Sequence, residues 1–103
     1  MVKLSIFWTE TAIRQRNIVF YYWIERNKSN TYAKKLNEKI KERTSLLKNN
    51  PELGKKTDFN NTRALSLGHY SILYQKIDSK IIITAFWDNR QDPEKLLKLF
   101  KKK

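Results

Sequence analysis

The feature that most constrains the fold is an uninterrupted apolar run at residues 18–24, which reads IVFYYWI. Apolar residues before and within this run recur at helical spacing, and Thr9 ahead of them is a typical helix N-cap, so the pattern predicts a helix over residues 10–26. A helix that is apolar on every side has to be covered on every side. The chain therefore needs both a sheet and a second helix to pack against this one.

The N-terminal half of the chain predicts one strand and a helical hairpin. Alternating apolar and polar side chains at residues 3–8 are typical of a strand. The polar turn after the first helix ends in Ser29 and Asn30, both suitable helix caps, and Pro51 marks the end of a second helix. The buried stripe of the second helix is expected to contain Ala33, Leu36, Ile40 and Leu47.

The C-terminal half predicts an antiparallel meander after a polar loop at residues 52–61. Asp92 and Pro93 favour the start of a short C-terminal helix. The expected order is β-α-α-β-β-β-α, an α+β fold in which an antiparallel sheet carries the N-terminal helical hairpin on one face. At this length, residues 1–103 form a single domain. The three predicted strands of the meander are residues 63–67, 70–77 and 80–87.

The charge balance limits the classes of partner. The chain has 22 Lys and Arg against 10 Asp and Glu, a formal net charge of +12, which indicates an anionic partner such as nucleic acid or an acidic protein. The longest apolar run is much shorter than the ~20 residues that cross a bilayer, and no stretch has the length of a secretory signal. We therefore expect a cytoplasmic protein without a membrane partner. Cysteine is absent, which excludes thiolate metal sites, and neither a metal nor a cofactor is expected.

The first helix carries more rings than a domain of two layers is expected to bury. We expect some of Phe20, Tyr21, Tyr22 and Trp23 to face solvent, and a surface of this kind usually marks a binding site. One interpretation is a groove for an amphipathic helix or a strand of another chain. The other is that a curled sheet and a tightly packed hairpin cover the rings, with the tyrosine hydroxyls pointing to water.

The second helix is rich in cations and has few acids. Most charged helical faces are only solvated, and this is the first interpretation. The alternative is a phosphate-binding stripe, since neutralising phosphates releases counterions and gives a salt-dependent affinity without sequence preference. The residues predicted to bind nucleic acid are Lys34, Lys35 and Lys41.

Arg63, His69 and Arg90 are the candidate catalytic residues. Two arginines can hold a phosphodiester while His69 or Tyr70 moves a proton, an arrangement that suits RNA cleavage by the 2′-hydroxyl without a metal. In a meander, however, Arg63 lies toward one end of the sheet and the other two toward the opposite end. They converge only if the sheet is strongly twisted. For the arginines, the alternative is a local salt bridge, for instance with Asp88, Asp58 or Asp92.

The order of elements, the basic balance and the segment RALSLGHYSILYQKIDSKIIITAFWDNRQDP resemble the RelE/ParE family of bacterial toxins from type II toxin-antitoxin modules. The motifs that carry this likeness are Arg-x-Leu at Arg63, Tyr-x-x-x-Tyr at Tyr70 and the arginine just past the last strand, Arg90. The resemblance implies a small basic toxin, neutralised by a cognate antitoxin whose C-terminal segment wraps around it. It leaves a homodimer open. The implied target is either DNA gyrase or the translating ribosome, where such toxins cleave mRNA.

Two departures from the family pattern favour the ParE branch. The RelE-type ribonucleases tend to have a basic residue directly after the strand tyrosine, where this chain has Ser71. They also tend to have a functional tyrosine near the C-terminal end, where this chain has only Leu97, Leu99 and Phe100. The leading expectation is therefore a ParE-like toxin that acts on gyrase. The alternatives are a ribosome-dependent mRNA endonuclease, in which His69 substitutes in part, and a non-toxic basic module that binds nucleic acid.

Overall fold

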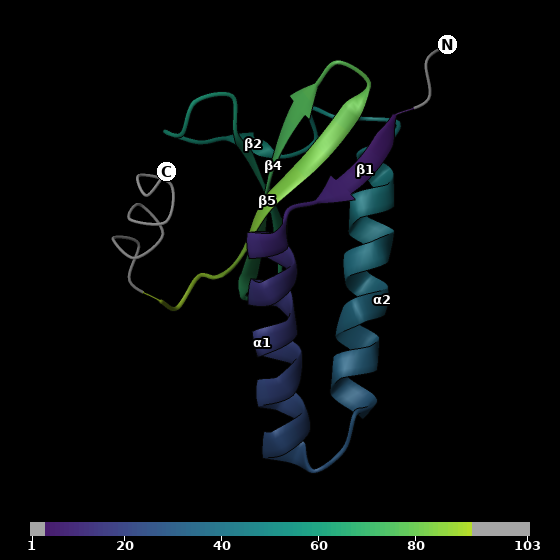
Figure 1. Cartoon of the computed structure of the whole chain (residues 1–103), viewed down its shortest axis with the longest axis vertical. Coiled ribbons are helices and arrows are strands. Elements are labelled where there is room, and N and C mark those ends of the chain that lie inside the picture. Colours follow the sequence, from purple (N-terminus) through teal and green to yellow (C-terminus); the bar gives the residue numbers. More distant parts are fainter. Residues whose placement is uncertain (1–3, 92–103) are drawn as a thin grey trace.

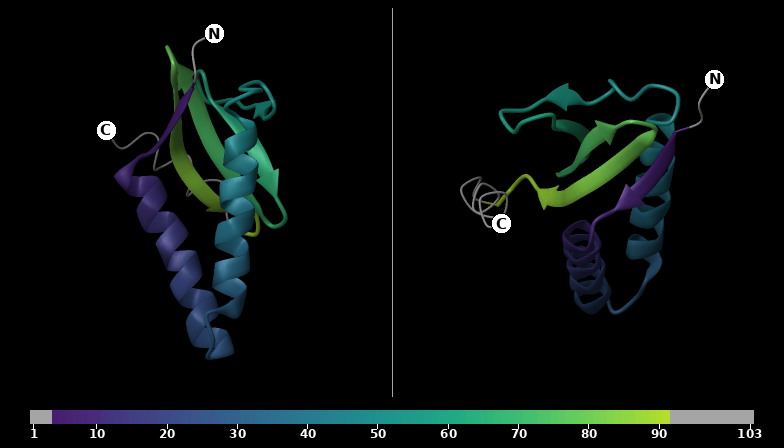
Figure 2. Two further views of the ribbon diagram at one scale, coloured as in Figure 1. Left: turned by 90° about the vertical axis from the view of Figure 1, so that its right-hand side faces the viewer. Right: turned by 45° about the horizontal axis from the view of Figure 1, so that its top comes forward.

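A computed structural model describes residues 4–91 of the chain. These residues form a five-stranded mixed sheet with a helical hairpin on one face (Figure 1, Figure 2). The α+β class and the position of the hairpin are as the sequence predicts. The C-terminal helix expected at Asp92 and Pro93 lies outside the described residues.

The elements begin and end close to their predicted bounds. The exception is one short additional strand inside the segment predicted as a loop. In chain order the elements are β1 (Ser5–Trp8), α1 (Glu10–Asn27), α2 (Thr31–Leu46), β2 (Lys55–Lys56), β3 (Arg63–Leu67), β4 (Tyr70–Ile77) and β5 (Lys80–Asp88).

The sheet has the order β1-β5-β4-β3-β2, and one of its pairings corrects the prediction. Strands β3, β4 and β5 pair antiparallel, as expected, and the additional strand β2 pairs antiparallel with β3. Strand β1 instead lies parallel to β5, with Ser5 opposite Lys80 and Trp8 opposite Ile83. The sheet is therefore mixed. The sequence did not predict this pairing, because the direction of β1 relative to β5 depends on how the chain returns through the helical hairpin and not on any local pattern.

Thr9 fixes the junction between β1 and α1. Its hydroxyl oxygen accepts a hydrogen bond from the Ala12 N–H at 3.1 Å, which confirms the predicted N-cap, and its hydroxyl donates to the Thr84 carbonyl at 3.4 Å. Thr84 is the extra residue of a β-bulge, since Leu73 pairs with Ala85 and the next β4 residue pairs with Ile83. The start of α1 is thus tied to the bulge in β5.

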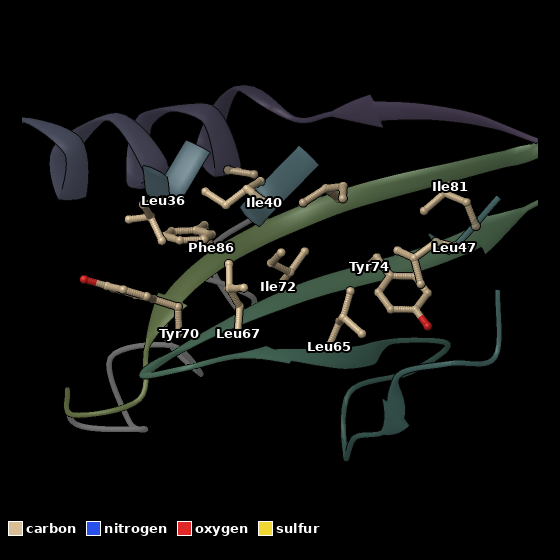
Figure 3. Close-up of a cluster of buried hydrophobic side chains, with 12 residues drawn as sticks. Leu36, Ile40, Leu47, Leu65, Leu67, Tyr70, Ile72, Tyr74, Ile81 and Phe86 are labelled. Carbon is tan, nitrogen blue, oxygen red and sulfur yellow. The ribbon is translucent and has the colours of Figure 1, made fainter. Parts of the chain in front are cut away.

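The main core lies between the hairpin and the sheet (Figure 3). The predicted stripe of α2, Ala33, Leu36, Ile40 and Leu47, is buried. Thr44 is buried as well, and its hydroxyl donates to the Ile40 carbonyl at 2.9 Å, so this polar group is satisfied inside the core. On α1 only Ala12 is fully buried, so the apolar run of this helix is not covered on every side.

Candidate binding surfaces

Two of the four rings predicted to contact a partner are engaged inside the domain. Phe20 is half-buried against the core, with the Arg16 guanidinium 5.7 Å from its ring centroid. Trp23 donates a hydrogen bond from Nε1 to the Tyr70 hydroxyl at 2.9 Å, and its ring packs on Tyr32 with a centroid separation of 4.8 Å. Trp23 therefore holds together α1, α2 and the start of β4.

The other two rings, Tyr21 and Tyr22, face solvent with 69% and 53% of their surface exposed. Two further apolar side chains of α1 are exposed with them, namely Ile13 at 37% and Ile18 at 61%. These isoleucines were not predicted from the sequence as binding residues. A helical wheel could have identified them, because Ile18 and Tyr21 lie on the side opposite Ala12.

We call Ile13, Ile18 and Tyr21 the outer face of α1. This face borders a shallow depression of about 450 Å³ that is also lined by Arg14 and Asn17. Three large apolar side chains exposed side by side on one helix are unusual for a surface that contacts only water. Contact of Tyr21 with an antitoxin stays a prediction.

Arg63, the first candidate catalytic residue, is held by the loop before β3. Its Nη1 donates to the Gly54 carbonyl at 2.8 Å and to the Glu52 carbonyl at 3.3 Å. Arg63 pairs with Tyr74 of β4, whereas the other end of the same ladder pairs Leu67 with Tyr70. Arg63 is thus four residues of β3 away from the end of the sheet where the other two candidates lie.

His69 and Arg90 do lie at one end of the sheet. His69 is exposed in the two-residue turn between β3 and β4, and its carbonyl accepts a hydrogen bond from the Asn89 N–H at 2.8 Å. Arg90 makes a two-point ion pair with Asp88, at 2.9 Å from Nε to Oδ1 and 2.8 Å from Nη2 to Oδ2. The expected local salt bridge is therefore present. The structure does not bring Arg63 to this pair, so the three candidates do not form one site in this structure.

The contacts at this end of the sheet shift the pKa values of two side chains, Asp88 and Tyr70. The hydrogen bonds from Arg90 lower the pKa of Asp88, so the carboxylate stays charged at neutral pH. Burial raises the pKa of Tyr70, although the hydrogen bond from Trp23 acts in the opposite direction. A tyrosine with a raised pKa whose oxygen already accepts a hydrogen bond is poorly suited to act as a base.

The residues predicted to bind nucleic acid lie on different sides of α2. Lys35 lines a groove of about 390 Å³ between α2 and the β3–β4 turn, together with Lys39 and Arg43. Lys34 and Lys41 are exposed elsewhere on the helix. Nucleic-acid binding by any of them stays a prediction, but only Lys35 lies in a groove with other cations.

Residues 4–91 contain no cluster of three His, Cys, Asp or Glu side chains able to hold a metal ion. Neither helix in this part of the chain has the length and apolar character that crossing a membrane requires.

The chain is basic, and its described residues form a small domain in which a mixed sheet carries a helical hairpin on one face and the hairpin exposes an apolar stripe. The chain matches the family model of the ParE toxin of type II toxin-antitoxin systems, parDE, over residues 6–93. It belongs to this family and is a ParE-type toxin of a type II toxin-antitoxin system.

A solved structure with a similar fold is also known. Among solved structures, the chain is similar to one from the chromosomal ParDE TA system of P. aeruginosa, with a TM-score of 0.72 and 19% sequence identity. The alignment covers 84% of this chain and 96% of that chain. At this identity the likeness concerns the fold alone. No curated protein matches the sequence.

Proposed function

We propose that this toxin stops growth by acting on DNA gyrase in the cytoplasm, and that a cognate antitoxin neutralises it by covering the outer face of α1. Family membership supports the gyrase target. The layout of the ribonuclease candidates supports it as well, because Arg63 is occupied by loop carbonyls and far from His69. Ser71, which stands where the ribonucleases tend to be basic, donates to the Asn89 side chain at 2.7 Å.

A supercoiling assay with purified gyrase tests the target. We expect the toxin to inhibit supercoiling, and its expression in bacteria to arrest growth and induce the DNA damage response while mRNA stays intact. Ribosome-dependent mRNA cleavage that is lost in Arg63→Ala and Arg90→Ala, with supercoiling unaffected, would instead establish the endonuclease alternative. Normal growth on expression of the intact protein would favour the non-toxic binding module.

One observation supports the proposed antitoxin site: Ile18 and Tyr21 lie on the same side of α1, with 61% and 69% of their surface exposed. Apolar side chains of this size contribute most to binding when they enter a partner's pocket. A second copy of this chain is a poor occupant, since it would bring a further +12 charge to the interface. The proposed occupant is an amphipathic antitoxin segment with an apolar side and acidic flanks. Tyr22 completes the contact, and Phe20 and Trp23 support it from within.

Paired substitutions test the antitoxin site. Ile18→Ser with Tyr21→Ser should weaken binding of the cognate antitoxin by about 10- to 100-fold in calorimetry. The matched control is Leu46→Ser with Ile77→Ser, which removes two apolar side chains of 47% and 46% exposure elsewhere. Equal affinity of the two double variants would place the antitoxin on another surface.

A further inference from the structure

The groove between α2 and the β3–β4 turn has one cationic wall. Lys35, Lys39 and Arg43 line it at intervals of four residues, and Glu42 is the one acid among its lining residues. Within residues 4–91, none of the three cations takes part in an ion pair or a side-chain hydrogen bond. Three unpaired cations therefore face one groove, with a single carboxylate to offset them.

The spacing of these cations fits a linear polyanion. A helix rises by ~1.5 Å per residue, so successive cations are about 6 Å apart along α2. This interval is close to the separation of successive phosphates in an extended single strand.

The remaining accessible groups of the groove are flat rings. Tyr32 stands at its border with 40% of its surface exposed, and His69 is exposed on the turn across from α2. Bases of a single strand stack on such rings in a sequence-tolerant way. The aliphatic lining, Leu36 and Leu67, is only 5% exposed in each case. An acidic peptide would therefore find little apolar surface for an anchoring side chain, whereas a base needs only a ring face.

From these observations we propose that this groove binds single-stranded nucleic acid. Its phosphates lie along Lys35, Lys39 and Arg43, and a base stacks on Tyr32 near His69. The proposal does not depend on gyrase as the target or on the antitoxin site, and it concerns a different face of the hairpin from the outer face of α1.

Fluorescence anisotropy with a labelled oligothymidylate at several salt concentrations tests the groove. Three phosphate contacts contribute about 2 to the slope of log affinity against log salt, at ~0.7 per contact for single strands. The triple variant Lys35→Gln, Lys39→Gln, Arg43→Gln should lose this part of the slope. The matched control Lys34→Gln, Lys41→Gln, Lys48→Gln removes the same charge outside the groove and should keep it. Equal slopes in the two variants would overturn the proposal.

Further variants test the roles of Glu42 and Tyr32, and the first predicts a gain in affinity. Glu42→Gln removes the acid of the groove and should tighten binding, whereas Glu38→Gln on the same helix should not. Tyr32→Leu should weaken binding by about tenfold if a base stacks there, with circular dichroism confirming that the variant is folded. Tighter binding of a duplex, or equal binding of an oligoglutamate peptide at the same ionic strength, would refute the assignment to single strands.

Discussion

Tyr74 anchors the loop before β3 to the core, and the substitution Tyr74→Phe tests how much this anchor stabilises the fold. The residue is 1% exposed. Its hydroxyl accepts a hydrogen bond from the Gly54 N–H at 2.8 Å and donates one to the Pro51 carbonyl at 2.7 Å. Figure 3 shows this hydroxyl at the margin of the core cluster. Because Arg63 donates to the Gly54 carbonyl, the same loop also holds the Arg63 side chain.

Tyr74→Phe keeps the ring and removes only the hydroxyl oxygen. The cost in free energy of unfolding is therefore that of leaving the Gly54 N–H and the Pro51 carbonyl without this hydrogen-bond partner. A buried N–H without a partner costs about 1–3 kcal/mol, and the half-buried Pro51 carbonyl costs less because water can reach it. We expect the free energy of unfolding to fall by about 2 kcal/mol, which lowers the Tm of a domain of this size by about 8–16 °C. Urea unfolding followed by tryptophan fluorescence, and thermal unfolding followed by circular dichroism, measure these changes.

The control for this substitution is Tyr21→Phe. Tyr21 is 69% exposed, and its hydroxyl has no hydrogen-bond partner within residues 4–91. Its Tm should stay within about 4 °C of the wild type, since surface changes of this kind usually alter the free energy of unfolding by less than about 0.5 kcal/mol. If Tyr74→Phe also melts within that margin, the hydroxyl does not hold the loop, and the reasoning from unpaired polar groups is wrong.

Three other experiments have expected outcomes. Gly54→Ala should cost about 1–3 kcal/mol in urea unfolding, because its Cβ would lie 2.8 Å from the Tyr74 ring. A double-mutant cycle of Trp23→Phe and Tyr70→Phe should give a coupling energy of about 0.5–1.5 kcal/mol, and additivity would show that their hydrogen bond contributes nothing. The lowered pKa of Asp88 means that its stabilising effect is present above its unfolded pKa and lost as the pH falls through the folded one. Asp88→Asn should therefore reduce the loss of stability below about pH 4, and an unchanged acid limb in a pH series of unfolding experiments would contradict this.

Local patterns were sufficient to predict most of the secondary structure. Residues 63–67 and 70–77 were predicted as strands from their composition and the glycine between them, and β3 and β4 have these bounds. The helices were predicted from apolar spacing and from Thr9 as a cap, and these signals also lie within a few residues of each other. Elements determined by near neighbours are therefore the ones that a single sequence predicts well.

The missed features of the fold depend on distant partners. Strand β2 consists of Lys55 and Lys56 alone, which have no apolar alternation and form a strand only because β3 lies beside them. The parallel pairing of β1 with β5 joins residues about 75 positions apart in the chain. No periodicity within either strand specifies its partner or its direction.

The candidate sites were predicted in part, for the same reason. The sequence indicated exposed rings in the run that contains Tyr21 and Tyr22, but which side of α1 faces outward depends on where the sheet covers it. Ile18 was therefore not singled out. Arg63 was expected either to form a local salt bridge or to bind an anion, whereas its observed partners are backbone carbonyls of the Glu52 to Gly54 loop, which have no sequence signature.

Trp23 joins the two proposed surfaces, so ligands at these surfaces should influence each other. Its neighbours Tyr21 and Tyr22 lie on the antitoxin side, while its own ring packs on Tyr32 and its Nε1 bonds to Tyr70, both of which line the groove. If the antitoxin fixes Trp23, the affinity of the groove for oligothymidylate should change a few-fold, and linkage requires the same factor for the antitoxin when the groove is filled.

Anisotropy titrations of the free toxin and of the toxin-antitoxin complex measure this factor. In Trp23→Phe the hydrogen bond to Tyr70 is absent, so the factor should fall toward one while each ligand still binds. A factor that persists unchanged in the variant would mean that direct contact between the two ligands, and not Trp23, couples the surfaces. A factor of one in the wild type would mean that the outer face of α1 and the groove beside α2 act independently, because the Trp23 contacts then transmit no free energy between them.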